Sequence, residues 1–414
     1  MNSPTPLSAP TRIGAMPSAP ARQLSPRAAF FLLASITVSL LAGSMAPTPI
    51  YPIYQAEWGF SALTVTVIFG IYALVLLAAL LVAGRLSDHI GRRPVLLAAT
   101  LAQVVTMALF ASASSVEGLL LARILQGLAT GAALAAIGAG MIDLDKTRGP
   151  VANAVAPPMG TALGGLLGGL AAHFLPAPTL TIYIVLAAVF LMQAIGVMRM
   201  AETVTSRPGA LRSMRPQFGV PAATRKPLAL AVPVLVAGWA LAGFFGSLGP
   251  ALLRTVFGLN ASLAGGIAGF ALAGSAAVAV LVLRHRAPRT VLSLGAIALL
   301  VGTAAIVLSL SQASSVAFFI GTIVAGIGFG AAFQGAIRSI VPTGPAARTR
   351  RCSVGRVRSL LSGDGHTFCR CWLFRRASRA AAADGGSVRR DGRCTRSGCA
   401  ARDGFAPQCV EADS

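Results

Sequence analysis

The side chains best suited to chemistry in this chain are charged residues set among glycines in residues 84–94. The segment reads Gly-Arg-Leu-Ser-Asp-His-Ile-Gly-Arg-Arg-Pro. Glycine permits a tight turn where two helices nearly touch. Asp88 can accept hydrogen bonds from a helix N-terminus or pair with arginine, and Arg92 and Arg93 can hold the loop at an anionic lipid surface. A short basic loop that merely tolerates glycine is the plain alternative. The residue types favour a gate or conformational switch formed by Gly84, Asp88, Gly91, Arg92 and Arg93.

A second group of polar side chains follows helical spacing within an apolar run. Arg123, Gln126 and Thr130 stand at i, i+3 and i+7, so a helix places them on one face. A charge inside a membrane helix is costly unless it faces protein or water. We therefore predict that this face lines a substrate or proton pathway. The alternative is that Arg123 extends to the nearby membrane interface.

Two residues of the later part of the chain are further candidates for the same pathway. Trp239 and Gln334 lie in apolar runs and could line a cavity, as could the neighbouring Phe244 and Phe245. Each of these side chain types also occurs in helix cores and on lipid-facing surfaces, so that reading stays open.

No residue pattern indicates catalysis or a cofactor. Neither a nucleophile elbow nor a phosphate-binding loop occurs, and the four histidines are scattered. The sequence therefore predicts a protein that is not an enzyme and has no cofactor and no metal site. Every acidic residue before position 343 falls at the end of an apolar run or in a loop. Protons are a candidate coupling ion, with Asp88 and Arg123 as the groups that could respond, and facilitated diffusion stays open.

Composition indicates that the bilayer is the solvent of this chain. The 414 residues are 55% hydrophobic and only 11% charged, with a mean hydropathy of +0.75, whereas soluble domains are about a quarter charged. The net charge of +22 would suggest nucleic acid. The basic residues before position 343 instead lie between apolar runs, which favours a membrane protein with lipid and a small molecule as partners and no nucleic acid.

Apolar runs long enough to span a membrane recur along the chain. We expect helices near 28–49, 62–84, 94–112, 117–141, 151–172, 179–198, 228–251, 263–283, 290–309 and 315–338. With the N-terminus inside the cell, 18 of the 20 basic residues before position 343 fall on the cytoplasmic side, as the positive-inside rule requires. Tyr51, Tyr54 and Trp58 then gather where an interfacial aromatic belt is expected, after prolines that end the first run.

The motifs resemble those of the major facilitator superfamily. Residues 84–94 resemble its signature loop, G-x-L-x-D-x-x-G-R-R/K, and the segment that begins at Arg123 resembles its helix 4 pattern, R-x-x-x-G-x-x-x-G. The resemblance covers about residues 28–342. It implies an all-α polytopic membrane protein of the major facilitator type, with two helical bundles around a central cavity and alternating access. It also implies a secondary transporter in the bacterial inner membrane, and we expect a monomer.

A proline and glycine cluster in the run 151–172 bears on helix packing and on transport direction. It is similar to the helix 5 motif of superfamily exporters, although the order of glycine and proline is scrambled. Small residues let helices approach closely, and prolines can kink a helix. We assign Pro157, Pro158, Gly160 and Gly164 to packing and take the cluster as a weak indication of export. Tight packing alone is the alternative explanation.

The chain changes character near residue 343. Fourteen arginines lie between Arg348 and Arg402, and all six cysteines follow residue 351: Cys352, Cys369, Cys371, Cys394, Cys399 and Cys409. Arginine codons CGN read one base later become GNN, which encodes Val, Ala, Gly, Asp or Glu. An arginine-rich tail can thus be a membrane helix rich in Ala, Val and Gly that is read out of frame, and we favour such a frameshift over a real tail. A zinc site from His366 and four cysteines, or a basic RNA-binding tail, are the alternatives.

The expected organisation follows from these boundaries. Residues 1–27 form a disordered cytoplasmic tail, 28–198 a six-helix N-terminal bundle and 199–227 a cytoplasmic linker. Residues 228–342 form an incomplete C-terminal bundle of about four helices, and 343–414 are out of frame and disordered. We expect export of a small molecule, impaired because helices 11 and 12 are missing. The rival interpretations are a membrane sensor or scaffold with a genuine Arg/Cys-rich module, and a non-functional transporter fragment.

Overall fold

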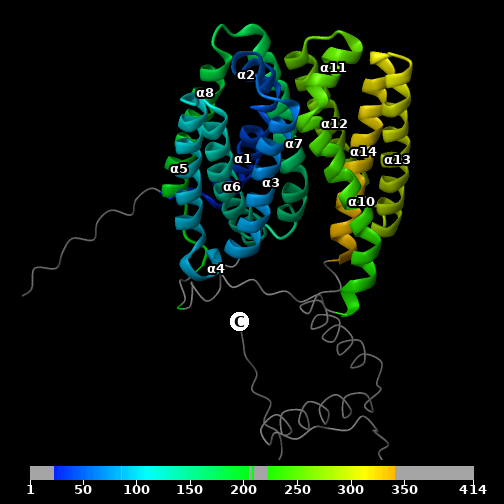
Figure 1. Cartoon of the computed structure of the whole chain (residues 1–414). Coiled ribbons are helices and arrows are strands. Elements are labelled where there is room, and N and C mark those ends of the chain that lie inside the picture. Colours follow the sequence, from blue (N-terminus) through cyan, green and yellow to red (C-terminus); the bar gives the residue numbers. More distant parts are fainter. Residues whose placement is uncertain (1–22, 85, 205–207, 209–221, 341–414) are drawn as a thin grey trace, which may run out of the picture. The chain divides into compact units, whose positions relative to one another are not determined.

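Helices make up the fold in the part of the chain that the structure describes. The computed structural model describes residues 23–84, 86–204, 208 and 222–340. The helices in chain order are α1 (Pro26–Met45), the 3-10 helix η1 (Thr48–Ile50), α2 (Tyr51–Trp58), α3 (Ala62–Ala83), α4 (Ser87–Ile90), α5 (Arg92–Ala111), α6 (Val116–Leu144), α7 (Gly149–Phe174), α8 (Pro178–Met198), α10 (Ala222–Ser247), α11 (Gly249–Phe257), α12 (Ala261–Leu283), α13 (Pro288–Ser311) and α14 (Ser315–Ile340) (Figure 1).

Ten helical segments among the described residues are long and apolar enough to cross a membrane. Each of the ten predicted apolar runs overlaps one of them, so the prediction of an all-α polytopic membrane protein is confirmed. Large side chains such as Leu63, Leu74 and Leu300 remain exposed on the helix surfaces. Lipid tails are the natural neighbours of such surfaces, because a helix satisfies its own backbone hydrogen bonds without water.

Short polar caps set where several helices begin. The side-chain oxygens of Ser25, Ser61, Ser115 and Asn260 each accept a hydrogen bond from a backbone N–H three residues ahead. These bonds satisfy N–H groups that the first turn of a helix leaves without a partner. Proline stands at the start of α8 and of α13, where its missing N–H costs nothing.

A short helix repeats at one end of each half of the chain. α2 ends at Gly59, with φ of 69°, and the cap Ser61 follows two residues later. α11 ends at Gly258, with φ of 65°, and the cap Asn260 follows in the same position. The repeat relates α1–α3 to α10–α12, as expected of a transporter built from repeated halves. We call this end of the helices the α2 end, and the opposite end the signature-loop end.

Two residues of the aromatic belt expected after the first run, Tyr51 and Tyr54, are buried in the structure. α1 ends at Met45, just before Pro47, as predicted, and the chain then continues through the separate helices η1 and α2 to Trp58. Pro52 lies in the first turn of α2, where proline is tolerated. Tyr51 and Tyr54 belong to the apolar core of the first half.

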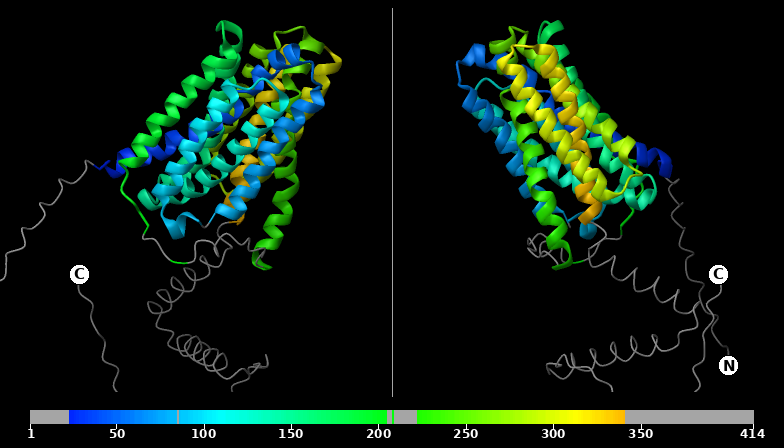
Figure 2. Two further views of the ribbon diagram at one scale, coloured as in Figure 1. Left: turned by 60° about the vertical axis from the view of Figure 1, so that its left-hand side comes forward. Right: turned by 90° about the vertical axis from the view of Figure 1, so that its right-hand side faces the viewer.

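Each half of the chain has its own apolar core. The core of the first half, α1 to α8, includes Phe110 and Phe190, and that of the second half, α10 to α14, includes Leu253 and Phe318. Further views show α13 running beside α14 at the edge of the second half (Figure 2). α10 begins at Ala222, within the predicted linker 199–227, while the predicted tails 1–27 and 343–414 lie almost wholly outside the described residues.

Candidate functional site

The signature loop turns on a single glycine. α4 lies between α3 and α5, and Gly91 separates α4 from α5 with φ of 102°. L-amino acids rarely adopt this conformation, and a Cβ here would also lie 2.6 Å from Oε2 of Glu202. Gly84 keeps a right-handed φ of −57°. The turn therefore requires glycine at position 91.

Arg92 joins the loop to the end of α6. Its side chain is 7% exposed, and its Nε donates to Oδ2 of Asp143 over 2.8 Å. Its Nη1 lies 3.2 Å from Oδ1 of Asp88 and donates to Oγ of Ser87 over 3.3 Å. Charge-assisted bonds of this kind are the stronger ones in proteins. The sequence placed Asp88 and Arg92 together and missed Asp143, although a carboxylate ending the next long helix stands at the same end of the bundle.

Arg93 points to a different helix. Its Nη2 donates to the carbonyl oxygen of Met198 at the end of α8. The backbone N–H groups of Arg92 and Arg93 donate to the two carboxylate oxygens of Glu202, each over 2.9 Å. Glu202 follows α8 and was not among the predicted site residues. Arg93 and Glu202 together attach the signature loop to α8.

Arg123 lies deep inside the first half. It is fully buried, its Nε donates to the hydroxyl of Tyr51 over 2.8 Å, and its Nη1 donates to the carbonyl oxygen of Ser44 and to Oε1 of Gln126 over 2.8 and 2.6 Å. Aromatic rings surround the guanidinium within 5.6 Å of its carbon, where cation–π attraction operates: Tyr51, Tyr72 and Phe110. The guanidinium of Arg123 therefore ends among protein groups of the first half, and its role in a pathway stays a prediction.

The three predicted residues of α6 share one polar network. Gln126 and Thr130 are fully buried. The Nε2 of Gln126 donates to the carbonyl oxygen of Gly43 over 3.0 Å, and the Nε2 of Gln103 donates to Oγ1 of Thr130 over 2.8 Å. The network connects α6 to α1 and α5 within the first half. Gln103 was not predicted, although it is a polar side chain in the middle of an apolar run.

Trp239 and Gln334 lie apart from this network. Trp239 is 59% exposed, and its ring meets that of Phe329 edge-on at 5.9 Å. Gln334 is buried, and its Nε2 donates to the carbonyl oxygen of Val280 over 2.9 Å, which ties α14 to α12. A role for these residues in the transport pathway stays a prediction.

The glycines of α7 form two separate contact faces. Pro157 and Pro158 lie within the continuous helix. Gly160 and Gly164 meet α1, where a Cβ would collide with the backbone. Gly169 meets α12, and a Cβ there would lie 2.9 Å from the carbonyl oxygen of Ser262. One face of α7 thus packs within the first half, and the other packs against the second half at the α2 end.

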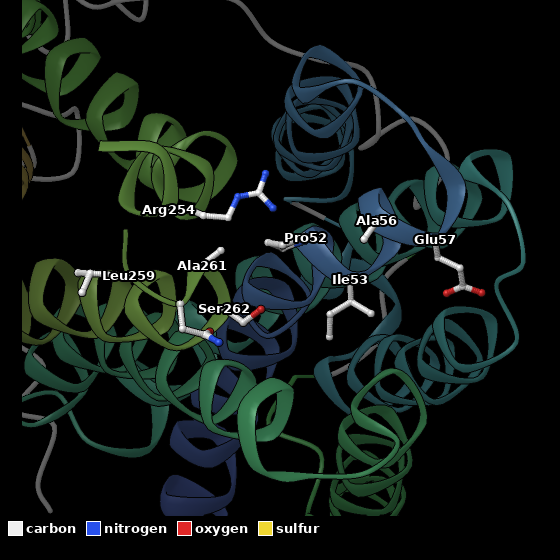
Figure 3. Close-up of a pocket in the computed structure, with 9 residues that line it drawn as sticks. Pro52, Ile53, Ala56, Glu57, Arg254, Leu259, Ala261 and Ser262 are labelled. Carbon is white, nitrogen blue, oxygen red and sulfur yellow. The ribbon is translucent and has the colours of Figure 1, made fainter. Parts of the chain in front are cut away.

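Two cavities lie where residues of both halves meet. The first, of about 620 Å³, opens at the α2 end between Glu57 of α2, Arg254 of α11 and Ser262 of α12 (Figure 3). The second, of about 40 Å³, is more enclosed and lined mostly by apolar residues, with Thr48 among them. The Thr48 hydroxyl is buried and has no hydrogen-bond partner among the described residues. Of the residues predicted for the pathway, Phe245 lines the second cavity. Neither cavity is lined by the others: Arg123, Gln126, Thr130, Trp239, Phe244 and Gln334.

No metal site is found in the part of the chain that the structure describes, where no group of three His, Cys, Asp or Glu side chains could hold an ion. The zinc alternative raised for the tail concerns residues outside this part. The described residues thus form a helical membrane protein of two halves, with a buried arginine in the first half and a charged loop at one end.

A comparison with known protein families supports the resemblance predicted from the motifs. The family model of the Major Facilitator Superfamily matches residues 32–351, and the chain belongs to that family. The predicted resemblance to this family is therefore confirmed.

Two relatives describe the similarity further. The tetracycline resistance protein, class C, of Escherichia coli is 34% identical over 160 residues, which is 36% of this chain and 39% of that protein. The crystal structure of a bacterial homologue of the human lysosomal transporter Spinster, in an inward-facing and unoccupied conformation, aligns with a TM-score of 0.62. It is 15% identical and covers 82% of this chain and 79% of that one, so it supports the fold alone.

Proposed function

We propose that this protein exports a small, mostly apolar molecule by alternating access and binds it between its two halves. The enclosed cavity carries the proposal. Both halves contribute to its apolar lining, which includes Met45, Phe245 and Phe329, and one buried hydroxyl, that of Thr48, is free to orient a ligand. Ligand sites commonly combine an apolar wall with a few polar groups. At about 40 Å³ the cavity must widen to admit substrate, as a rearrangement of the halves would allow.

Export is favoured over uptake by the relative named for tetracycline resistance. A transporter can confer resistance by removing a drug from the cell. The glycine and proline cluster of α7, similar to that of superfamily exporters, points the same way. We propose proton coupling, with Asp88 and Arg123 as the responding groups. Arg123 sits in a buried hydrogen-bonded network, where a change of charge nearby would be strongly felt.

The proposal includes the setting in which the protein works. Its place is the bacterial inner membrane, with the N-terminus and the signature-loop end in the cytoplasm, because 18 of the 20 basic residues before position 343 then lie inside. It works as a monomer, in contact with lipid and substrate and without nucleic acid, and it catalyses no reaction.

We further propose that the chain transports poorly with its present residues 343–414. The repeated halves imply six spans each, and the described second half contributes four. A bundle without two of its helices would present protein-facing surfaces to lipid. The direct comparison is between this chain and one whose codons after about position 340 are read in the adjacent frame.

The test measures drug accumulation in bacteria that lack their own exporters. Cells that express either form of the chain are loaded with tetracycline, with and without a protonophore. The proposal expects lower accumulation with the adjacent-frame form, reversed by the protonophore, and a weaker effect with the present chain. Thr48→Val should raise the KM about five- to tenfold by removing one hydrogen bond.

Thr66→Val is the matched control for Thr48→Val. Thr66 lies on the exposed side of α3 and bonds only to the carbonyl oxygen of Ala62 in its own helix, so its loss should leave the KM unchanged. Equal KM values for the two variants would remove the enclosed cavity from the substrate pathway. If neither form of the chain lowers the accumulation of tetracycline or of a second apolar drug, the export proposal fails.

A further inference from the structure

α5 and α8 cap each other at the signature-loop end. α5 begins at Arg92, and its first backbone N–H groups have no partner within the helix. The carboxylate of Glu202, four residues beyond α8, accepts two of them over 2.9 Å each. In return, Arg93 donates to the carbonyl oxygen of Met198 in the last turn of α8. Each helix end thus receives the charge that its dipole favours.

The Glu202 carboxylate gathers backbone N–H groups from two segments. Besides Arg92 and Arg93, its Oε1 accepts from its own neighbours Thr203 and Val204 over 2.9 and 3.2 Å. Gly91 permits this approach, since a Cβ there would lie 2.6 Å from Oε2. The glycine of the signature loop is therefore needed for its positive φ and also for room beside this carboxylate.

We propose that Glu202 is a positioning residue of the gate. Its carboxylate fixes the backbone at Arg92, and this aims the buried guanidinium at Asp143 and Asp88. Without the Glu202 carboxylate as its anchor, the start of α5 would lose two hydrogen bonds. The backbone of Arg92, from which its side chain extends, would then be less firmly held. The inference rests on the proposed transport cycle for its kinetic test, whereas label mobility and amide exchange test the anchor without any transport.

The same anchor fixes the point where the chain leaves the first half. The backbone N–H of Leu24, just before α1, donates to the carbonyl oxygen of Arg199 over 2.9 Å. The segment from Met198 to Val204 is thereby bonded to the start of α1 and to the start of α5.

Glutamine cannot replace Glu202 in this arrangement. A carboxylate offers two acceptor oxygens and no donor, whereas an amide offers one oxygen and directs an NH₂ group at the remaining backbone N–H. Glu202→Gln therefore keeps the size of the side chain and breaks one side of the cap. Arg199→Gln is the matched control, because it removes a neighbouring charge from an exposed side chain and leaves the backbone bond of Arg199 in place.

The experiment uses spin labels on the full chain with its six tail cysteines changed to serine. One label replaces Ile90 in α4, which is 40% exposed, and a second, in a separate sample, replaces Leu101 in α5, which is 44% exposed. Glu202→Gln should increase the mobility of the label at 90 and leave that at 101 unchanged. Hydrogen exchange of the Arg92 and Arg93 amides should rise about tenfold, the loss expected for about one charge-assisted bond, with no change in Arg199→Gln.

Transport rates expressed per folded protein separate a role in gating from a loss of stability. Glu202→Gln should lower the maximal transport rate and leave the KM unchanged, opposite to Thr48→Val. Identical label mobility and amide exchange in Glu202→Gln and Arg199→Gln would overturn the proposal. So would equal loosening at positions 90 and 101, since that would show that α5 as a whole depends on Glu202.

Discussion

One methyl group at the contact between the halves should change which conformation the protein prefers. Gly266 of α12 faces α7, and a Cβ there would lie 2.6 Å from the carbonyl oxygen of Gly165 and 2.8 Å from Cα of Gly169. Ordinary contacts begin near 3.4 Å. Gly266→Ala therefore requires the two backbones to separate by ~1 Å, and overpacking of this kind costs about 1–3 kcal/mol.

That cost applies only while the halves touch at the α2 end. Alanine gains about 1 kcal/mol over glycine in any helix, but it gains this in every conformation and so shifts no equilibrium. The clash should lower the population of the state closed at the α2 end by about 5- to 150-fold relative to the open one. The matched control is Gly274→Ala on the same helix, where the nearest atoms, including Cβ of Ala162, lie 3.9 Å away.

The assay is a distance distribution between spin labels at the α2 end. Leu63 at the start of α3 and Val316 at the start of α14 are 72% and 69% exposed and belong to different halves. Gly266→Ala should move the distribution towards longer distances, and Gly274→Ala should leave it as in the parent chain. Matching distributions for the two variants would refute the claim that these glycines hold the halves together.

The remaining predictions concern stability and follow from burial and bonding. Asp143→Asn should lower the free energy of unfolding by about 1–2 kcal/mol, because its partner Arg92 is 7% exposed. Asp88→Asn should lower it by only ~0–1 kcal/mol, because Asp88 is 53% exposed. Denaturation in detergent micelles checks both, and a larger loss for Asp88→Asn would contradict the view that Asp143 is the main partner of Arg92. Arg123→Lys should cost about 3 kcal/mol in the same assay, since an ammonium cannot reproduce bonds to Tyr51, Ser44 and Gln126; unfolding at the parent's denaturant midpoint would argue against the network. Hydrogen bonds from the backbone N–H groups of Arg148 and Thr147, helped by the Arg148 charge, lower the pKa of Asp145 below its usual 3.8. Asp145 therefore makes the protein more stable than Asp145→Asn at pH values above 3.8, and this advantage is lost as the pH falls through the lowered pKa. The melting temperatures of the two proteins, measured across this pH range, check the prediction. A difference between them that grows on acidification would contradict it.

Hydropathy predicted the spans because each must be long and apolar to cross a bilayer. It did not predict α2 and α11, which continue the path of the first and seventh spans. The prolines after the first run suggested a helix end, whereas Pro52 stands in the first turn of α2, and Pro250 stands likewise in the first turn of α11. A proline breaks a helix that precedes it and can equally begin one that follows, and the sequence alone does not distinguish these cases.

The sequence predicted those residues of the signature-loop site that are neighbours in the chain. Asp88, Gly91 and Arg92 form one short loop, so their spacing was informative. Asp143 and Glu202 stand 51 and 110 residues from Arg92, and only the packing of α5 against α6 and α8 brings them near.

The direction of the Arg123 face could not be predicted. α6 is apolar around most of its circumference. Its one polar face shows that these side chains lie together, but not which neighbouring helix they meet. The i, i+3, i+7 spacing placed Arg123, Gln126 and Thr130 together, and the structure turns them towards α1 and α5 within the first half.

The measurement that tests the central claim most directly is drug transport by the purified chain in lipid vesicles. Vesicles with a proton gradient would contain the present chain, its adjacent-frame form or that form with Thr48→Val, and fluorescence would report the movement of tetracycline. The account predicts gradient-driven transport by the adjacent-frame form, weaker transport by the present chain and a raised KM with Thr48→Val. Correctly inserted protein that moves neither tetracycline nor another apolar drug, with or without the gradient, would contradict it.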